Sequence, residues 1–277
     1  MNRNILKLPQ ALFTVKRFNS SVLTKVQIND GVKEITMCHQ KTRNSLSLSM
    51  MQNLLENISS ENDNKMLRAI IITAEGPIFS AGHNLKELSE ESGKLQQLKV
   101  FHLASQLMYS IIDSPLPIIA KIDGLAAAAG CQLVAQCDIA ICTDRSTFST
   151  PGANFGIFCS TPGVALARNV QKKTALKMLL TGSTINSVEA KSSGLVTTVC
   201  KPEDLDEEVC NITNAIKAKS RSVVELGKKF FYDQINFDIK KAYEIGGIKM
   251  VQNLQMLDGK EGIKSFIEKR KPQWTHN

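Results

Sequence analysis

Two short apolar runs, each linked to a helix-like segment, limit the fold of this 277-residue chain more than any other feature. The runs are "LRAIIITAEG" at 67–76 and "PIIAKIDG" at 117–124, and a helical pattern over 95–112 separates them. Strands that are apolar on both faces are typical of buried parallel sheets, and connections of this length are too long for hairpins. The sequence therefore predicts an α/β fold whose strands are joined by helical crossovers.

The two ends of this core follow different patterns. Residues 22–39 alternate around Asn29-Asp30-Gly31, which predicts two antiparallel strands joined by a tight turn, and helical spacing follows over 47–58. From residue 186 onward strand signals nearly vanish apart from "LVTTV", and helical patterns cover about 203–218, 221–235, 238–257 and 260–268. We therefore expect a leader at 1–20, an α/β core at 21–200 and a helical C-terminal region at 201–277.

Much of the positive charge lies at the start of the chain. The net charge is +8, and residues 1–20 contribute four basic residues and no acid, so the remainder carries +4. Apolar residues interleave with these basic ones, as in a transit peptide for mitochondrial import. A disordered basic tail is the alternative. No apolar run reaches the roughly 18 residues of a membrane span, and with aromatic residues at 5% no aromatic-basic stripe points to nucleic acid.

The cysteines and histidines do not form a metal-binding pattern. The seven cysteines are an odd number without a C-x-x-C pair, which favours a reducing compartment such as the mitochondrial matrix or the cytosol. The four histidines lack ligand spacing, so no metal is expected. Cys131 and Cys159 are possible nucleophiles, but no basic neighbour is evident in the sequence, and buried inert thiols are the favoured interpretation.

A run of small residues stands where a helical pattern begins. The stretch "LAAAAGCQLVAQCDIA", residues 125–140, contains Ala126–Ala129 and Gly130. The first amides of a helix have no partners inside it and lie at the positive end of its dipole, so a ligand oxygen can bind there if no bulky side chain intervenes. Close packing of a helix on a strand is the alternative, because it also selects alanine and glycine.

A second turn of small residues makes the ligand interpretation stronger. The segment "GPIFSAGHNLKEL" at 76–88 also leaves an apolar strand, through Ser80-Ala81-Gly82, and enters a helix-like stretch. Two strand ends that each present free amides can form an oxyanion hole, in which two N–H donors stabilise one carbonyl oxygen as it gains negative charge.

Five motifs, in order, resemble the enoyl-CoA hydratase/isomerase (crotonase) superfamily over roughly residues 22–272. They are "IFSAGHNLKEL", "PIIAKIDGLAAAAGCQLVAQCDIAI", "FSTPGANFGIFCSTPGVALARNV", "MLLTGSTINSVEAKSSGLV" and "EGIKSFIEKRKP". The resemblance implies a spiral of ββα units and a helical C-terminal region that assembles homotrimers or hexamers. It also implies a coenzyme A thioester of fatty acid metabolism as substrate or ligand, with no separate cofactor.

The resemblance also implies roles for individual residues. The thioester carbonyl would lie between the backbone amides of His83 and Ala129. Ser80 and Ala81 would line the adenine pocket through backbone contacts, and Lys86 would lie near the CoA phosphates.

The sequence departs from the family pattern at both glutamates that hold and activate water in family hydratases. The matching positions hold Gln132 and Gly152, and slightly downstream, where isomerases place a carboxylate, the chain has Ser160 and Thr161. An amide can orient water but cannot exchange its proton, and glycine has no side chain. Positioned acid–base groups contribute about 10²–10⁴-fold in rate, so ordinary hydration is expected to be weak.

Three functions remain open from the sequence. The first is an acyl-CoA-binding protein with weak or atypical activity. The second is catalysis of another kind. It is either decarboxylation or thioester chemistry that uses His83, or slow hydration through a water held by Gln132. The alternative for His83 is that its imidazole points away from the ligand and bonds locally. The third is a non-catalytic scaffold or an RNA-binding relative.

Overall fold

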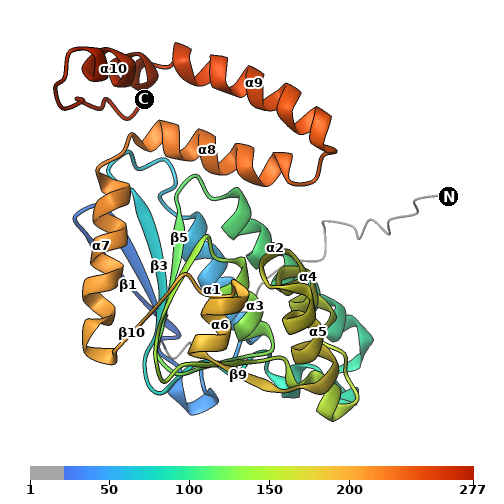
Figure 1. Cartoon of the computed structure of the whole chain (residues 1–277). Helices are drawn as coiled ribbons and strands as arrows, with labels where there is room; N and C mark the ends of the chain where they lie inside the picture. Colours follow the sequence, from blue (N-terminus) through green and yellow to red (C-terminus); the bar gives the residue numbers. More distant parts are fainter. Residues whose placement is uncertain (1–21) are drawn as a thin grey trace.

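The computed structural model describes residues 22–277, so the expected leader at 1–20 lies outside the described residues. The chain forms two sheets with helices packed around them (Figure 1). The strands are β1 Thr24–Asn29, β2 Val32–Met37, β3 Ala69–Ala74, β4 Ile78–Ser80, β5 Ile118–Ile122, β6 Leu125–Ala127, β7 Ile139–Thr143, β8 Thr147–Ser149, β9 Thr184–Asn186 and β10 Thr198–Cys200. The helices are α1 Leu48–Ser59, α2 Gly93–Asp113, α3 Ala129–Gln136, α4 Ser160–Asn169, α5 Lys172–Thr181, α6 Ser187–Ser193, α7 Leu205–Lys217, α8 Arg221–Gln234, α9 Ile239–Gln255 and α10 Leu257–Ile267.

The larger sheet has the order β1-β2-β3-β5-β7-β10. Strands β1 and β2 pair antiparallel, which confirms the predicted hairpin, while β2, β3, β5, β7 and β10 pair in parallel. At the hairpin turn both Asp30 and Gly31 have positive φ angles, as a two-residue turn matching the strand twist requires. The predicted α/β fold with helical crossovers is confirmed.

A smaller sheet of three-residue strands has the order β4-β6-β8-β9. Each of β4, β6 and β8 follows a strand of the larger sheet and precedes a helix, so the unit of two strands and one helix occurs three times. This repetition is the spiral of ββα units that the family resemblance implies. It brings the ends of β4 and β6 together, because those two strands pair in parallel.

Helices cover both faces of the larger sheet. Helix α7 packs on β3 and β7 through Leu205 and Val209, whereas α1, α2 and α3 lie on the opposite side (Figure 1). Seven of the eight residues of α3 are buried, so this short helix runs through the centre of the protein. Its N-terminus is therefore held in place by packing.

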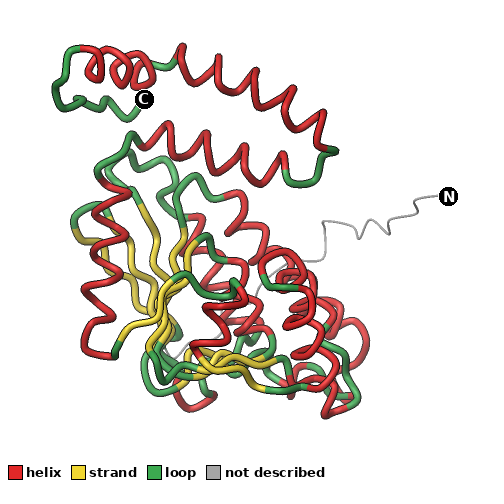
Figure 2. The backbone as a smooth tube through the Cα atoms, viewed as in Figure 1, coloured by secondary structure: helices red, strands yellow, loops and turns green. Residues whose placement is uncertain are grey.

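The last helices form a separate layer. In Figure 2, α8, α9 and α10 lie above the sheets, and α8 is the one that faces the rest of the protein. The structure confirms the predicted helices of this region within a few residues at each end. No helix within residues 22–277 is long and apolar enough to cross a membrane.

Candidate functional site

The turn after β4 leaves one backbone amide, that of His83, outside its hydrogen bonds. The buried Ser80 hydroxyl donates to the Asn44 carbonyl at 2.8 Å and accepts from the Gly82 amide at 3.2 Å. The Ala81 amide donates to the Arg43 carbonyl at 3.0 Å. The next amide, that of His83, takes part in none of these bonds, and Gly82, with a φ of +89°, is the residue whose conformation turns it away from the strand.

The four alanines adopt three different conformations. Ala126 and Ala127 are buried in β6, so at these two positions the packing alternative holds and the small side chains do not open a helix to a ligand. Ala128 has a φ of 49° and a ψ of −117°, which is a strained backbone for a residue with a side chain. Ala129 begins α3, and its amide therefore has no partner one turn earlier inside the helix.

The two turns lie in direct contact. A Cβ atom on Gly82 would stand 3.2 Å from the amide nitrogen of Ala129 and 2.8 Å from the Cβ of Ala128. A Cβ on Gly130 would stand 2.5 Å from the carbonyl oxygen of Ser80. Both glycines are thus required for the close approach, which brings the amide that follows Gly82 next to the start of α3.

The imidazole of His83 makes local contacts. Its Nδ1 lies 3.2 Å from the Leu46 carbonyl oxygen, and its ring meets Phe101 edge-on at a centroid distance of 5.5 Å. Because a carbonyl only accepts, Nδ1 carries the hydrogen and Nε2 is the lone-pair nitrogen. Burial lowers the pKa of His83 below its usual 6.5, so the ring is neutral at pH 7. Nε2 is buried and has no hydrogen-bond partner among the described residues.

Gln132 lies one helical turn after Ala129 and lines a cavity. The side chain is 5% exposed, and its Oε1 atom is buried without a partner among residues 22–277. The cavity, of about 800 Å³, is enclosed by α2, α3, α4 and α8. Its wall combines apolar and polar side chains, including Met108, Thr161, Val164 and Phe231.

Gly152 is enclosed by the loop that follows it. It lies in the short 3-10 helix Pro151–Phe155, and a Cβ at this position would stand 2.2 Å from the Ile157 carbonyl oxygen and 2.6 Å from the Cys159 Sγ. No real Cβ atom approaches backbone this closely, so the loop conformation admits only glycine. Ser160 and Thr161 open α4, and Thr161 faces the cavity.

Asp138 is the acid in the cavity wall, and its oxygens are engaged. Oδ2 accepts from the Ile118 amide and from Lys228 Nζ, each at 2.7 Å, and Oδ1 accepts from the Tyr232 hydroxyl at 2.8 Å. Lys228 also donates to the carbonyls of Ile111 at 2.8 Å and Leu116 at 2.9 Å. The network joins α8 to the core, so the role of Asp138 is structural. Lys228 and Tyr232 were missed, although their spacing of four puts them on one face of α8.

The thiols near the site are poor nucleophiles. Burial raises the pKa of Cys131 to about 12, and burial also raises that of Cys159. Neither thiol is therefore ionised at neutral pH. Within the described part of the chain no group of three or more His, Cys, Asp or Glu residues is placed to hold a metal ion.

The residues expected to contact CoA differ in accessibility. Ser80 is fully buried, with its hydroxyl used in the turn, so it can line a pocket only through its backbone. Ala81 is half-buried, and Lys86 is exposed in the 3-10 turn Leu85–Glu87 just beyond His83. Ala81, His83 and Lys86 thus lie in one short segment after β4, and Gly82 within it adjoins the start of α3.

A model of the family described as enoyl-CoA hydratase/isomerase matches residues 27–277. The chain belongs to this family. The match confirms the family that the five sequence motifs resemble.

Family members with known names and structures resemble most of the chain. The human protein "Enoyl-CoA hydratase domain-containing protein 3, mitochondrial" is 50% identical over 247 residues, which are 89% of this chain and 82% of that protein. The relative of the same name in Xenopus laevis is also 50% identical, over 92% of this chain and 87% of that protein. The crystal structure of the human protein has a TM-score of 0.89 at 49% identity, covering 91% of this chain and 100% of that chain. An enoyl-CoA hydratase structure from Mycobacterium smegmatis has a TM-score of 0.89 at 40% identity, over 92% and 99%.

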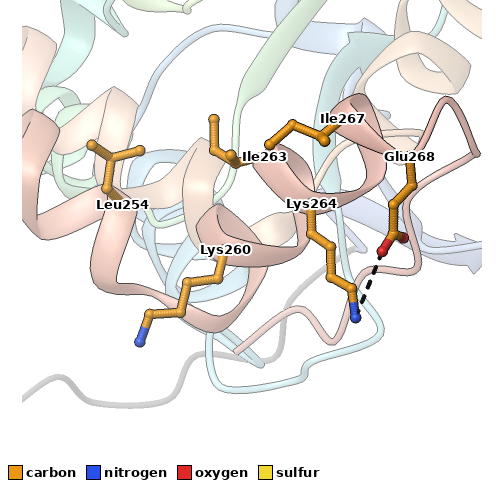
Figure 3. Close-up of a pocket in the computed structure, with 6 residues that line it drawn as sticks. All are labelled: Leu254, Lys260, Ile263, Lys264, Ile267 and Glu268. Carbon is orange, nitrogen blue, oxygen red and sulfur yellow. Dashed lines mark ion pairs between the residues drawn. The ribbon is translucent and has the colours of Figure 1, made fainter.

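A second hollow, of about 390 Å³, lies far from this chemistry between α9 and α10 (Figure 3). Leu254, Ile263 and Ile267 form its apolar lining, and Lys260, Lys264 and Glu268 stand at its edge. None of its lining residues belongs to the turn after β4 or to the start of α3, so it is not the candidate active site.

Proposed function

We propose that this protein binds fatty acyl-CoA thioesters and catalyses ordinary enoyl-CoA hydration weakly or not at all. The observation that carries the proposal is the contact between Gly82 and Ala129, which supports two main-chain donors, the amides of His83 and Ala129, acting on one thioester oxygen. Amide donors fixed by packing stabilise a developing oxyanion without reorganisation. In this proposal the half-buried Ala81 would contact the adenine of CoA, and the exposed Lys86 would contact its phosphates.

The surroundings of these amides support weak hydration. Gln132 cannot exchange a proton, Gly152 has no side chain, and the Asp138 oxygens are bonded to Ile118, Lys228 and Tyr232. Among residues 22–277, no other carboxylate lines the cavity that Gln132 faces. Loss of both acid–base groups removes about 10²–10⁴-fold or more of the rate.

Calorimetry on the full chain tests the proposal directly. Crotonyl-CoA and longer acyl-CoAs are expected to bind, while loss of the enoyl absorbance in the same samples proceeds slowly. Absence of binding by every acyl-CoA would overturn the proposal, as would hydration at the rate of a hydratase that has both glutamates.

Catalysis through His83 is the second candidate, supported by its buried Nε2 lone pair, which has no partner among residues 22–277. An enolate formed by loss of CO₂ from a malonyl-type thioester needs oxyanion stabilisation more than a strong base, and the two amides fit that need. Incubation with malonyl-type CoA esters, comparing His83→Ala with Gln132→Ala, separates this candidate from slow hydration through a Gln132-held water. RNA binding without acyl-CoA binding would favour the scaffold alternative instead.

Two further observations support proposals about where this protein is located and how it assembles. Relatives about 50% identical carry the word mitochondrial in their names, which supports a mitochondrial matrix location for this protein and an import role for residues 1–20.

Helices α9 and α10 expose many large apolar side chains, Tyr243, Ile248, Val251, Leu257 and Phe266 among them. Exposed apolar area on this scale supports a homotrimer or hexamer, which sedimentation of the full chain would test.

A further inference from the structure

The short segment before α1 has an unusual backbone. Arg43 and Asn44 have φ angles of 56° and 50°, in the left-handed region that residues with side chains rarely adopt. Asparagine tolerates this region better than most residues, but two such residues in succession persist only where surrounding contacts hold them. The contacts of this segment must therefore offset the strain.

The side chain of Asn44 holds the link between β3 and β4. Its Nδ2 atom donates to the carbonyl oxygen of Glu75 at 3.0 Å and to that of Ile78 at 2.8 Å. An amide NH₂ group has two hydrogens, one for each of these carbonyls. Asn44 is 1% exposed, so both carbonyls depend on a buried donor that is costly to lose. One side chain thus fixes the point at which β4 begins.

The main chain of the same segment holds the turn that follows β4. The Asn44 carbonyl accepts from the Ser80 hydroxyl at 2.8 Å, and the Leu46 amide donates to the Gly82 carbonyl at 2.8 Å. Leu46 also forms a parallel bridge with His83, and its carbonyl oxygen lies 3.2 Å from His83 Nδ1. These bonds engage the groups on both sides of the His83 amide, and none of them uses that amide.

We infer that Asn44 is a positioning residue of the oxyanion hole, which holds the His83 amide in the direction of the thioester oxygen. The inference rests on the proposed function, since it assumes that a thioester binds at this amide. At 1% exposure Asn44 does not touch the ligand and acts only through β4 and its turn. Such action matters because a displacement of about 1 Å at a reacting group can cost about 100-fold in rate.

Infrared spectroscopy of a bound thioester tests the inference on the full chain. The probe is butyryl-CoA labelled with ¹³C at the carbonyl, which has no double bond to hydrate. Two amides that donate to the carbonyl oxygen polarise the C=O bond, so binding to the unaltered protein should lower its stretching frequency. In Asn44→Gly, which keeps the left-handed backbone and lacks the side chain, we expect the band to return toward the frequency of the free ligand. Affinity should fall by less than about tenfold, the size of one neutral hydrogen bond.

Two further variants separate positioning from stability. Asn44→Asp replaces the two N–H donors by acceptors at nearly constant size, so it should move the band as Asn44→Gly does. Asn57→Ala is the matched control, because it removes a side-chain bond of 3.0 Å to Thr24, between α1 and β1. It should lower stability and leave the band in place.

Each outcome decides a different point. An unchanged band in either Asn44 variant overturns the inference and leaves acyl-CoA binding intact. So does a band in the unaltered protein at the frequency of the free ligand, or an equal displacement of the band in Asn57→Ala. If the unaltered protein does not bind butyryl-CoA or any longer acyl-CoA, the proposed function fails, and the inference fails with it.

Discussion

The thiol of Cys159 and the glycine at 152 are in contact, with the Sγ atom 2.6 Å from the point where a Cβ on residue 152 would stand. The Ile157 carbonyl oxygen approaches the same point to 2.2 Å. The loop itself therefore occupies the space that a side chain at residue 152 would need. Under the proposed function, this path of the main chain between residues 152 and 159 is the reason that a single substitution should not restore hydration.

Restoring both glutamates is expected to fail as a gain of function. Gly152→Glu forces the loop to move, with a loss of about 1–3 kcal/mol in the free energy of unfolding typical of overpacking, and the Gln132→Glu/Gly152→Glu variant still hydrates crotonyl-CoA slowly. Chemical denaturation and an enoyl absorbance assay measure the two effects. The control is Gly227→Ala in α8, where an added Cβ meets nothing within 4 Å and stability should hold or rise. Fast hydration by the double variant would contradict the account of the loop.

Replacing Ala128 by glycine is expected to stabilise the protein. With φ at 49° and ψ at −117°, Ala128 holds a conformation that glycine adopts without strain, so Ala128→Gly should raise the free energy of unfolding by about 1 kcal/mol. The matched control is Ala135→Gly inside α3, which should lower it by about 1 kcal/mol or more. Denaturation midpoints of the two variants should therefore move in opposite directions, and a loss of stability in both would show that Ala128 is unstrained.

The sequence predicted the long elements well and the short ones poorly. Strand β3 and helix α2 carry enough apolar periodicity to be recognised, and Asn29-Asp30-Gly31 defines a turn by local chemistry alone. Strands β4, β6, β8 and β9 have three residues each, which is too short for a pattern, so Ala126 and Ala127 appeared to belong to a helix start. Their conformation comes from pairing with strands distant in the sequence.

The same contrast applies to the site. Adjacent small-residue turns pointed to two amides, and the substitutions at 132 and 152 were evident from the motifs. The contact of Gly152 with Ile157 and Cys159 could not be predicted, because it depends on how a loop folds back on itself. The bond from Lys228 to Asp138 could not be predicted either, because it joins residues that are 90 positions apart in the sequence.

Lys228 is expected to be a major contributor to stability although it lies outside the reacting centre. Its side chain is 7% exposed, and its ammonium bonds to Asp138, Ile111 and Leu116, so Lys228→Met leaves the Asp138 carboxylate without its cation. Breaking a buried pair from one side costs about 3–5 kcal/mol. Lys229→Met, at an exposed neighbouring position, should change stability by less than about 0.5 kcal/mol. Equal denaturation curves for the two variants would mean that the network contributes little.

The neutral state of His83 predicts a specific dependence of stability on pH. Burial lowers its pKa below 6.5, so as pH falls through 6.5 the unfolded chain gains a proton that the folded chain does not. The folded state therefore loses stability between pH 6.5 and the lower folded pKa, and its His83 contribution is fully present above pH 6.5. In His83→Gln, the loss of stability that comes from protonation of His83 in the unfolded chain is absent. His39→Gln changes a surface histidine that is bonded to Thr42, so this variant still shows that loss. Unfolding free energies at pH 7.5 and 5.5 measure the difference, and an NMR titration that places the His83 pKa above 6.5 would refute the buried, neutral imidazole.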